Sequence, residues 1–300
     1  MRISICIPTF RRPDGFARAV RSVFAQVGLS EMAVELVAID NSPEGSALSL
    51  LRRIADRAPI PMRVGHERRA GVAHARNAAL ALAKGDIIIW LDDDQEASPL
   101  WLDRLLAAHA KLKSDVVFGP IAAEAPQSKQ RAYFERFFAR SGPQEDVALE
   151  APCGIGNSLM VRARLLNALA PFDAAANETG GEDDRLFAEA AARGLRFGWA
   201  HEAWVTEHVP PSRATANYAL RRAFAYGQGP CETAAREGAH WQIARHMLVG
   251  AGQALVFGVS ALFASLVRPP QSLPLWDRAA RGAGKLFWFA EQKFYGAHTR

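Results

Sequence analysis

Three consecutive carboxylates, Asp92, Asp93 and Asp94, directly follow the apolar run from Ile87 to Leu91. That run has no polar residue and is rich in isoleucine, which predicts a strand buried on both faces of a parallel sheet. Ligands of open α/β sheets bind beside the carboxyl ends of the strands. Adjacent carboxylates repel one another unless a cation neutralises them, and oxygen ligands of this kind suit Mn²⁺ or Mg²⁺. The triplet therefore predicts a divalent-metal site, and the alternative is a solvated acidic turn in front of a helix that begins near Ser98.

A second acidic cluster, Glu182 to Asp184, follows the glycine pair Gly180 and Gly181. The apolar spacing behind the cluster predicts a helix that runs to Gly194. A carboxylate held beside a sugar hydroxyl can act as a general base, so this cluster is a candidate for acid–base chemistry. The alternative is a helix cap, because acids in the first turn gain about 0.3–1 kcal/mol from the helix dipole.

Several single residues could bind an anionic or nucleotide ligand, and each also has a purely structural explanation. Asp40 follows a predicted strand and could accept hydrogen bonds from a ribose or a base, or it could be an ordinary turn residue. Arg69 and Arg76 could contact phosphate, although Arg76 taken alone is better explained as a solvated helix residue. His208 could be a metal or phosphate ligand, or a structural histidine. The turn at 154–157 contains two glycines, which could let a substrate approach the backbone or could only allow a tight turn.

Two kinds of spacing alternate along the first hundred residues. Unbroken or period-two apolar runs predict strands, and apolar residues three to four apart predict helices. This alternation is typical of a parallel, doubly wound sheet with helices on both faces. The predicted strands cover 2–10, 33–39, 62–66 and 86–91, and the predicted helices cover 15–26, 47–58 and 72–84. The less regular second half predicts strands at 115–122 and 158–161, a helix at 131–140 and a strand-like segment at 199–208.

Composition and missing motifs exclude several classes of protein. The net charge is +5, yet the acids gather at 92–94 and 182–184, which suits an anionic ligand bridged by a metal better than it suits DNA. Neither of the usual glycine-rich phosphate loops is present, and no nucleic-acid-binding motif is visible, so no nucleic-acid partner is expected. The three cysteines are far apart, which predicts a reducing compartment. The N-terminus lacks the pattern of a signal peptide, so a cytoplasmic location is expected.

The C-terminal region predicts an association with the membrane. Met247 to Val267 contains no charged residue, and its 21 positions make about 30 Å of helix, enough to cross the core of a bilayer. The following segment, Trp276 to Tyr295, mixes basic and aromatic residues in the way that suits a membrane interface. The first segment could span the membrane, re-enter it or lie on it. The alternatives are a helix packed on the rest of the chain and a contact between two copies.

In their order and spacing, these motifs resemble those of family 2 glycosyltransferases with the GT-A fold, and of the bacterial succinoglycan-type branch in particular. The resemblance covers roughly Arg2 to Gly229. The matching segments are Ile5–Phe10, Ala38–Ser42, Gly71–Asn77, Leu91–Asp94, Gly180–Asp184 and Glu207–Pro210. The Gln-x-x-Arg-Trp motif of processive synthases is absent, and Tyr218 to Gly227 stands in its place. This departure favours the addition of a single sugar.

The resemblance implies a role for each matching residue. Asp183 would be the catalytic base, and Asp94 and His208 would hold Mn²⁺ or Mg²⁺. The residues implied to bind the nucleotide sugar are Thr9, Asp40, Arg69, Arg76, Asp92 and Asp93, with Thr9 and Asp40 at the nucleoside and Asp92 near the ribose. Gly156 and Asn157, from the glycine-containing turn outside the matching segments, and Glu182 of the second acidic cluster are the residues expected to bind the acceptor.

The expected protein is an α/β enzyme with a Rossmann-like, mostly parallel GT-A sheet and a helical, membrane-associated tail. Residues 1–120 would bind the nucleotide sugar, 121–235 would carry the acceptor site and the base, and 236–300 would form the tail. The expected activity is an inverting, metal-dependent, non-processive transfer of one sugar from a nucleotide-diphosphate sugar to a lipid-linked or other glycan acceptor, at the cytoplasmic face of the cell membrane. The alternatives are a membrane-docked nucleotide-sugar binding protein without transfer activity and a sugar-nucleotide nucleotidyltransferase. The latter requires glycines after the first strand that this sequence lacks.

Overall fold

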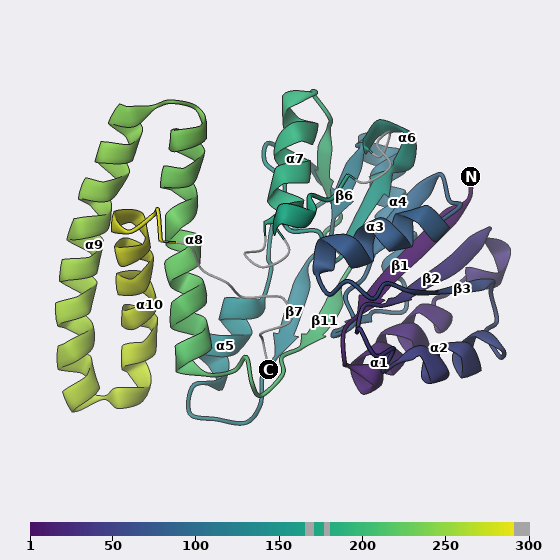
Figure 1. Cartoon of the computed structure of the whole chain (residues 1–300), viewed down its shortest axis with the longest axis horizontal. Coiled ribbons are helices and arrows are strands. Elements are labelled where there is room, and N and C mark those ends of the chain that lie inside the picture. The colour runs from purple at the N-terminus through teal and green to yellow at the C-terminus, as the bar shows by residue number, and fades with distance from the viewer. Residues whose placement is uncertain (166–170, 177–180, 291–300) are drawn as a thin grey trace. The chain divides into compact units, whose positions relative to one another are not determined.

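The computed structural model describes residues 1–165, 171–176 and 181–290 (Figure 1). Gly180, from the glycine pair before the second acidic cluster, and the predicted interfacial aromatics Phe294 and Tyr295 lie outside these ranges. Contacts group the chain into two compact units. Unit 1 contains Met1–Ala122 and Ala139–His208, and unit 2 contains Ala123–Phe138 and the described residues from Val209 onward. These groups differ from the predicted divisions at 120 and 235, which concern function and stay a prediction.

The first half of unit 1 has the predicted alternation of strands and helices. Its strands lie in the order β3-β2-β1-β4, and each pair of neighbours is parallel. The carboxyl ends of β1 and β4 therefore meet at one edge, as the sequence predicted for the aspartate triplet. The strands are β1 (Ile3–Thr9), β2 (Val34–Asp40), β3 (Met62–His66) and β4 (Ile87–Trp90), and the helices are α1 (Pro13–Phe24), α2 (Leu48–Ala55) and α3 (Val72–Leu82).

The second half of unit 1 extends this sheet with strands of both directions. β9 is antiparallel to both β4 and β6, and β10 is parallel to β6 and antiparallel to β8, so the eight-stranded sheet is mixed. A smaller sheet has the order β5-β11-β7. The strands are β5 (Gln95–Ala97), β6 (Val116–Phe118), β7 (Ile121–Glu124), β8 (Val147–Leu149), β9 (Ser158–Val161), β10 (Phe197–Trp199) and β11 (Val205–His208).

One predicted strand, 115–122, is wrong as a single element. It is divided at Gly119 and Pro120 into β6 and β7, which belong to different sheets. Proline has no N–H for a ladder hydrogen bond and favours a strand end, which explains the division.

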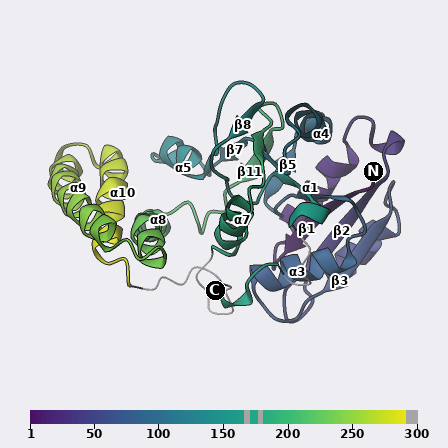
Figure 2. The same cartoon turned by 90° about the horizontal axis from the view of Figure 1, so that it is seen from above.

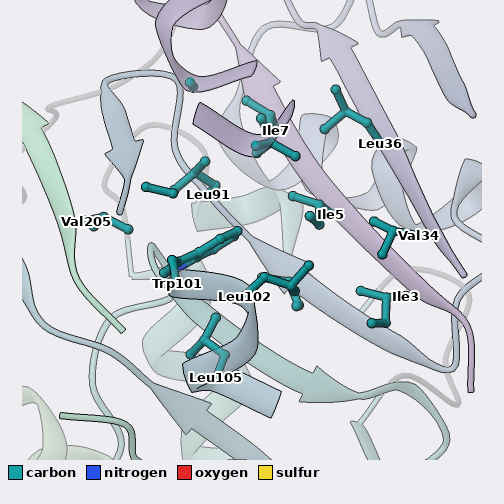
Figure 3. Packing of buried hydrophobic residues seen from close by; sticks show 14 of the residues in the cluster. Ile3, Ile5, Ile7, Val34, Leu36, Leu91, Trp101, Leu102, Leu105 and Val205 are labelled. Atoms are coloured by element: carbon teal, nitrogen blue, oxygen red, sulfur yellow. The ribbon is translucent and has the colours of Figure 1, made fainter. Parts of the chain in front are cut away.

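Helices cover both faces of the main sheet. On one face, Ile3, Ile5 and Ile7 pack with Trp101, Leu102 and Leu105 of α4, and α1 covers the same face (Figure 3). On the other face, side chains of α3 and α7 pack with Cys6, Trp90 and Phe118. Each large apolar side chain buried in this way stabilises the fold by about 1.5–3 kcal/mol. The remaining helical elements of unit 1 are α4 (Trp101–Leu112), α6 (Arg162–Leu165), α7 (Glu182–Ala192) and the 3₁₀ turns Leu29–Glu31 and Ala174–Ala176.

Unit 2 is helical, and its three long helices lie side by side (Figure 2). Tyr133 of the short helix α5 donates a hydrogen bond to Asp277 of α10 over 2.7 Å, and Phe138 of α5 stacks on Tyr218 of α8. By length and composition, α9 could cross a membrane, and it is the one such helix among the described residues. The helices are α5 (Arg131–Phe138), α8 (Ala216–Arg236), α9 (His240–Val267) and α10 (Pro269–Leu286).

Candidate active site

The aspartate triplet lies in the turn between β4 and β5, beside the end of β1. Asp93 accepts hydrogen bonds from the Thr9 hydroxyl over 2.8 Å and from the Phe10 N–H over 3.4 Å. One Arg12 nitrogen donates to Asp93 over 3.0 Å and to Asp94 over 2.7 Å. The neighbouring strands β1 and β4 thus bring together two residues from the predicted set, Thr9 and Asp93, and add Arg12, which the sequence did not point to.

Arg12 neutralises part of the negative charge of the aspartate triplet. Burial, together with the charges of Asp94 and Asp92, raises the pKa of Asp93 to about 6 against the lowering effect of Arg12. Burial alone would lower the pKa of Arg12, but the charges of Asp93 and Asp94 outweigh it, so that pKa is raised above its usual value. Arg12 therefore stays protonated and places one positive charge between the two carboxylates.

Arg76 connects the two acidic clusters that the sequence singled out. Its buried guanidinium contacts Glu182 of α7 and lies 3.8 Å from Asp92. It also lies over the ring of Phe172, 5.7 Å from the ring centroid. Burial raises the pKa of Glu182, and the charge of Arg76 opposes that shift. Arg76 is therefore not a solvated helix residue, because it holds the first turn of α7 beside the triplet.

The turn at 154–157 fills the space between Asp92 and Asp183. A Cβ at Gly156 would lie 2.5 Å from an oxygen of Asp92, so any larger residue would displace that carboxylate. One step along the chain, the Ile155 N–H donates to Asp183 over 3.0 Å. Asp183 is half-buried. Its carboxylate accepts a hydrogen bond from the same turn that packs against Asp92.

Arg140 fixes the position of this turn. Its guanidinium donates to the carbonyls of Gly154, Gly156 and Asn157 over 2.5–2.9 Å, and also to the carbonyl of Gly119. The sequence predicted Arg140 as the last residue of an aromatic, basic helix, but α5 ends at Phe138. Arg140 instead holds the backbone on which Asp183 rests.

Two other predicted site residues, Asn157 and Asp40, are buried, and their side chains form hydrogen bonds within the fold. The buried Asn157 has a φ of 55°; its oxygen accepts from the Trp101 indole, and its nitrogen donates to the carbonyls of Pro120 and Ala203. The buried Asp40 accepts from the N–H and hydroxyl of Ser42 and from the N–H of Ala47. Asn157 thus positions the 154–157 turn, and Asp40 shapes the loop after β2. Their contacts with an acceptor and a nucleoside stay predictions.

Arg69 lies on the exposed loop before α3. Its guanidinium pairs with Glu67 over 2.8 Å, and hydrogen bonding to Arg69 lowers the pKa of Glu67 to about 2. The Asn41 side chain donates to the carbonyls of Glu67 and Arg69 and accepts from the Gly71 N–H. The loop is therefore anchored while the Arg69 side chain remains 70% exposed, where a solvated ligand can reach it.

Asp94 and His208, the two predicted metal ligands, lie on paired segments of the chain. Strand pairing places His208 next to Asp94, since the His208 N–H donates to the Asp94 carbonyl over 2.8 Å. The His208 ring lies 3.1 Å from a carboxylate oxygen of Glu96. Within the described ranges, no three acidic, histidine or cysteine side chains are already gathered around one metal position. Mg²⁺ sites that act on nucleotides use one or two carboxylates and complete their coordination with substrate phosphates, so this small donor set suits such a site.

Sequence reasoning missed Arg12 and Arg140. Arg12 stands directly before the Pro13 that opens α1, beside the carboxyl end of β1, and this position was a usable signal. Arg140 carried no such signal, because its partners are backbone carbonyls that come together only in the folded chain.

Comparison with known proteins identifies the first half of the chain. Residues 4–169 match the family described as "Glycosyl transferase family 2". The chain is 29% identical to the succinoglycan biosynthesis protein ExoM of Rhizobium meliloti (strain 1021) over 233 residues. These residues cover 76% of this chain and 74% of that protein. It is 25% identical over 148 residues to a glucosyl-dolichyl phosphate glucuronosyltransferase of Haloferax volcanii, covering 48% of this chain and 46% of that protein.

A solved structure is similar over nearly the whole chain. This is the mannosyltransferase PcManGT of Pyrobaculum calidifontis, with 21% identity and a TM-score of 0.63, covering 97% of this chain and 88% of that one. The likeness confirms the predicted GT-A fold. Because the family match spans more than half of its residues, this chain belongs to glycosyl transferase family 2 and is a glycosyltransferase.

Proposed function

We propose that this enzyme transfers one sugar from a nucleotide-diphosphate sugar to a glycan or lipid-linked acceptor in polysaccharide synthesis, with inversion at the anomeric carbon. One observation carries the proposal: Arg76 and the 154–157 turn join the aspartate triplet to Asp183. A site with carboxylates for a metal-bound diphosphate and a separate carboxylate for a hydroxyl suits a single displacement. The relationship to ExoM supports a role in polysaccharide synthesis.

In this proposal, Asp183 is the general base. It accepts the proton of the acceptor hydroxyl as the hydroxyl oxygen attacks the anomeric carbon and the bond to the diphosphate oxygen breaks. The Ile155 N–H donates to one oxygen of the Asp183 carboxylate over 3.0 Å, and the Asp184 N–H donates to the other over 3.1 Å. These bonds fix the carboxylate, and each oxygen keeps a second lone pair with which it could accept that proton. Asn157, Glu182 and Arg140 hold the turn and the helix on which Asp183 stands, and the lack of a side chain at Gly156 lets this turn pack directly against Asp92.

The donor would bind at the carboxyl edge of β1 and β4. Thr9, Asp40 and Asp92 would contact the nucleoside, and Arg69 and Arg76 would face its phosphates, with Asp93 held in place by Thr9 and Arg12. Mn²⁺ or Mg²⁺ on Asp94 and His208 would neutralise charge on the departing nucleoside diphosphate. The similar mannosyltransferase structure contains GDP-mannose and Mn²⁺, which supports this proposal. The missing processive motif supports the addition of a single sugar.

We further propose that the enzyme works at the cytoplasmic face of the membrane. Helix α9 has the length and composition to enter a bilayer. The Haloferax volcanii relative carries a lipid-linked substrate in its name, which supports a lipid-linked acceptor here.

The test is a screen of UDP-, GDP- and dTDP-sugars against the purified chain with Mn²⁺, with Mg²⁺ and with EDTA. We expect one donor to raise the melting temperature only with a metal present and to release nucleoside diphosphate when a lipid-linked glycan is added. Metal-dependent binding without transfer to any acceptor would favour a binding protein instead. Formation of a nucleotide sugar from a sugar phosphate and a nucleoside triphosphate would favour a nucleotidyltransferase.

A further inference from the structure

Helix α9 exposes most of its large apolar side chains, unlike a helix packed on the core of a protein. Ten of the seventeen exposed large apolar residues of the described chain lie on it, so the exposed apolar surface is concentrated on one helix. They include Leu255 at 69%, Phe263 at 69% and Leu266 at 85% exposure. The part from Leu248 to Val267, here called the apolar face, is about 30 Å long. Its exposed hydroxyl, Ser260, is satisfied by the Val256 carbonyl over 2.8 Å.

The covered side of α9 carries small residues and two polar side chains that bond to α10. Gln253 accepts a hydrogen bond from Lys285 of α10 over 2.6 Å, and Ser265 accepts one from the Trp276 indole over 3.2 Å. Close approach of glycines allows this packing, because a Cβ on Gly250 would lie 2.7 Å from the Gly282 carbonyl. Most large apolar side chains of α9 thus face outward, and two of its polar side chains bond to the neighbouring helix, which is the arrangement of a protein surface in contact with lipid.

The packing of α10 on α9 indicates whether α9 crosses the bilayer or lies in its interface. The two helices run antiparallel along their length, and the Arg278 guanidinium lies 5.1 Å from the ring centroid of Phe257, at the middle of the apolar face. Asp277 and Arg281 form an ion pair in the same part of α10. If α9 crossed the membrane with α10 packed on it, these charges would lie at the bilayer centre, where ionised side chains are strongly disfavoured. Arg278 is exposed within the described part of the chain, so in a spanning arrangement it would face lipid.

The ends of the apolar face identify its partner. Trp241 and Arg245 lie on the exposed side at its start, and Arg268 follows its last residue. No acidic residue occurs between Glu237 and Asp277. Guanidinium groups at both ends of an apolar surface, with an indole at one end, suit the headgroup region of an anionic leaflet. A second copy of the chain fits less well, because it would bring an equally basic, acid-free helix against this one.

We propose that α9 lies in the plane of the membrane interface, with the apolar face in an anionic leaflet and α10 on its aqueous side, and that it does not cross the bilayer. The proposal rests on the membrane association proposed above and settles how that association is made. The enzyme is then bound to one leaflet, from which a lipid-linked acceptor can be taken.

The first experiment measures flotation of the full chain with vesicles of phosphatidylcholine, with and without phosphatidylglycerol. We expect binding that strengthens with phosphatidylglycerol and falls about fivefold for Arg268→Ala, the effect of one basic residue at an anionic surface. Leu255→Glu combined with Val259→Glu should lower binding more than tenfold. Val27→Glu is the matched control, since Val27 is a similarly exposed apolar residue in unit 1, and it should bind like the wild type.

The second experiment measures depth and sidedness. Leu248→Cys, Leu255→Cys and Leu266→Cys are labelled with an environment-sensitive fluorophore and quenched by lipids that carry spin labels at different depths. All three should lie at one shallow depth, about 5–10 Å below the headgroups. Cysteines at Glu237 and Gln271, beyond the two ends of α9, should both react with an impermeant maleimide added outside the vesicles. The wild type, whose own cysteines are buried or half-buried, sets the background.

Three results would overturn the proposal. A deepest position at Leu255, or protection of Gln271→Cys until detergent is added, would show that α9 crosses the bilayer. Labels shielded without vesicles in a sedimenting dimer would show that a second copy covers the apolar face. No binding to either vesicle, with sugar transfer intact, would remove the membrane association and leave the proposed transfer reaction standing.

Discussion

Gly156 lies so close to Asp92 that a single methyl group should disable the site. In Gly156→Ala, the new Cβ would be 2.5 Å from an oxygen of Asp92 and 3.0 Å from the Gln95 amide nitrogen. Ordinary contacts of this kind begin near 3.4 Å, so the carboxylate must move by about 0.9 Å. A displacement of about 1 Å at a reacting centre lowers the rate by about 10²-fold. We therefore expect kcat/KM for sugar transfer to fall about 10²-fold.

Gly154→Ala is the matched control in the same turn. Its Cβ would lie 3.7 Å from Asp183 and 3.9 Å from Arg140, which are ordinary contacts, so its kcat/KM should stay within about threefold of the wild type. Forcing a methyl group into a packed site also lowers stability by about 1–3 kcal/mol, so Gly156→Ala should melt earlier.

The assay combines steady-state transfer kinetics with thermal unfolding of Gly156→Ala, Asp92→Ala and the double variant. If the clash is the cause, Asp92→Ala should remove most of the stability loss from Gly156→Ala, because the two changes are then coupled. Wild-type kinetics and stability in Gly156→Ala would refute the close contact between Gly156 and Asp92.

Three further variants test separate parts of the site. Asp94→Ala should give the same affinity for UDP or GDP with and without Mn²⁺ in calorimetry, and a remaining metal dependence would place the cation elsewhere. Arg76→Met leaves Glu182 as an uncompensated buried charge and should lower the free energy of unfolding by about 3–5 kcal/mol in denaturant titration. The exposed control Arg53→Met should change that free energy by less than about 0.5 kcal/mol, and equal losses would contradict the role of Arg76. Asn157→Ala removes three hydrogen bonds and should lower the same free energy by about 2–4 kcal/mol; a neutral change would mean that Asn157 does not hold the turn.

Local patterns predicted the first half of the fold well. The bounds of β3 and β9 agree with the prediction, and the other strands of the parallel half, with α1 to α3, agree to within about three residues at each end. These elements depend on periodicity and on turn residues within a few positions, which a sequence displays directly. The antiparallel direction of β9 was not predictable in this way, because a buried apolar strand has the same pattern in either direction.

The site was predicted as two separate acidic clusters, and the sequence could not say what joins them. The link depends on Arg76, which the sequence alone predicted to be a solvated side chain. It also depends on Gly156, whose lack of a side chain allows the turn to pack against Asp92. The roles of Asn157 and Asp40 inside the fold depend on partners that are between 2 and 56 positions away. The grouping of α5 with the C-terminal helices was equally hidden, since it depends on the Tyr133–Asp277 hydrogen bond across 144 positions.

The central claim is that Asp183 is the general base of sugar transfer. The most direct measurement is single-turnover release of nucleoside diphosphate by the wild type, Asp183→Asn and the neighbouring control Asp184→Asn, with donor affinity measured in parallel. Loss of a general base lowers the chemical step by about 10²–10⁴-fold. We predict a loss of this size in Asp183→Asn with donor affinity unchanged, and near-normal turnover in Asp184→Asn. Wild-type turnover in Asp183→Asn, or an equal loss in both variants, would contradict the claim and leave the second acidic cluster as a helix cap.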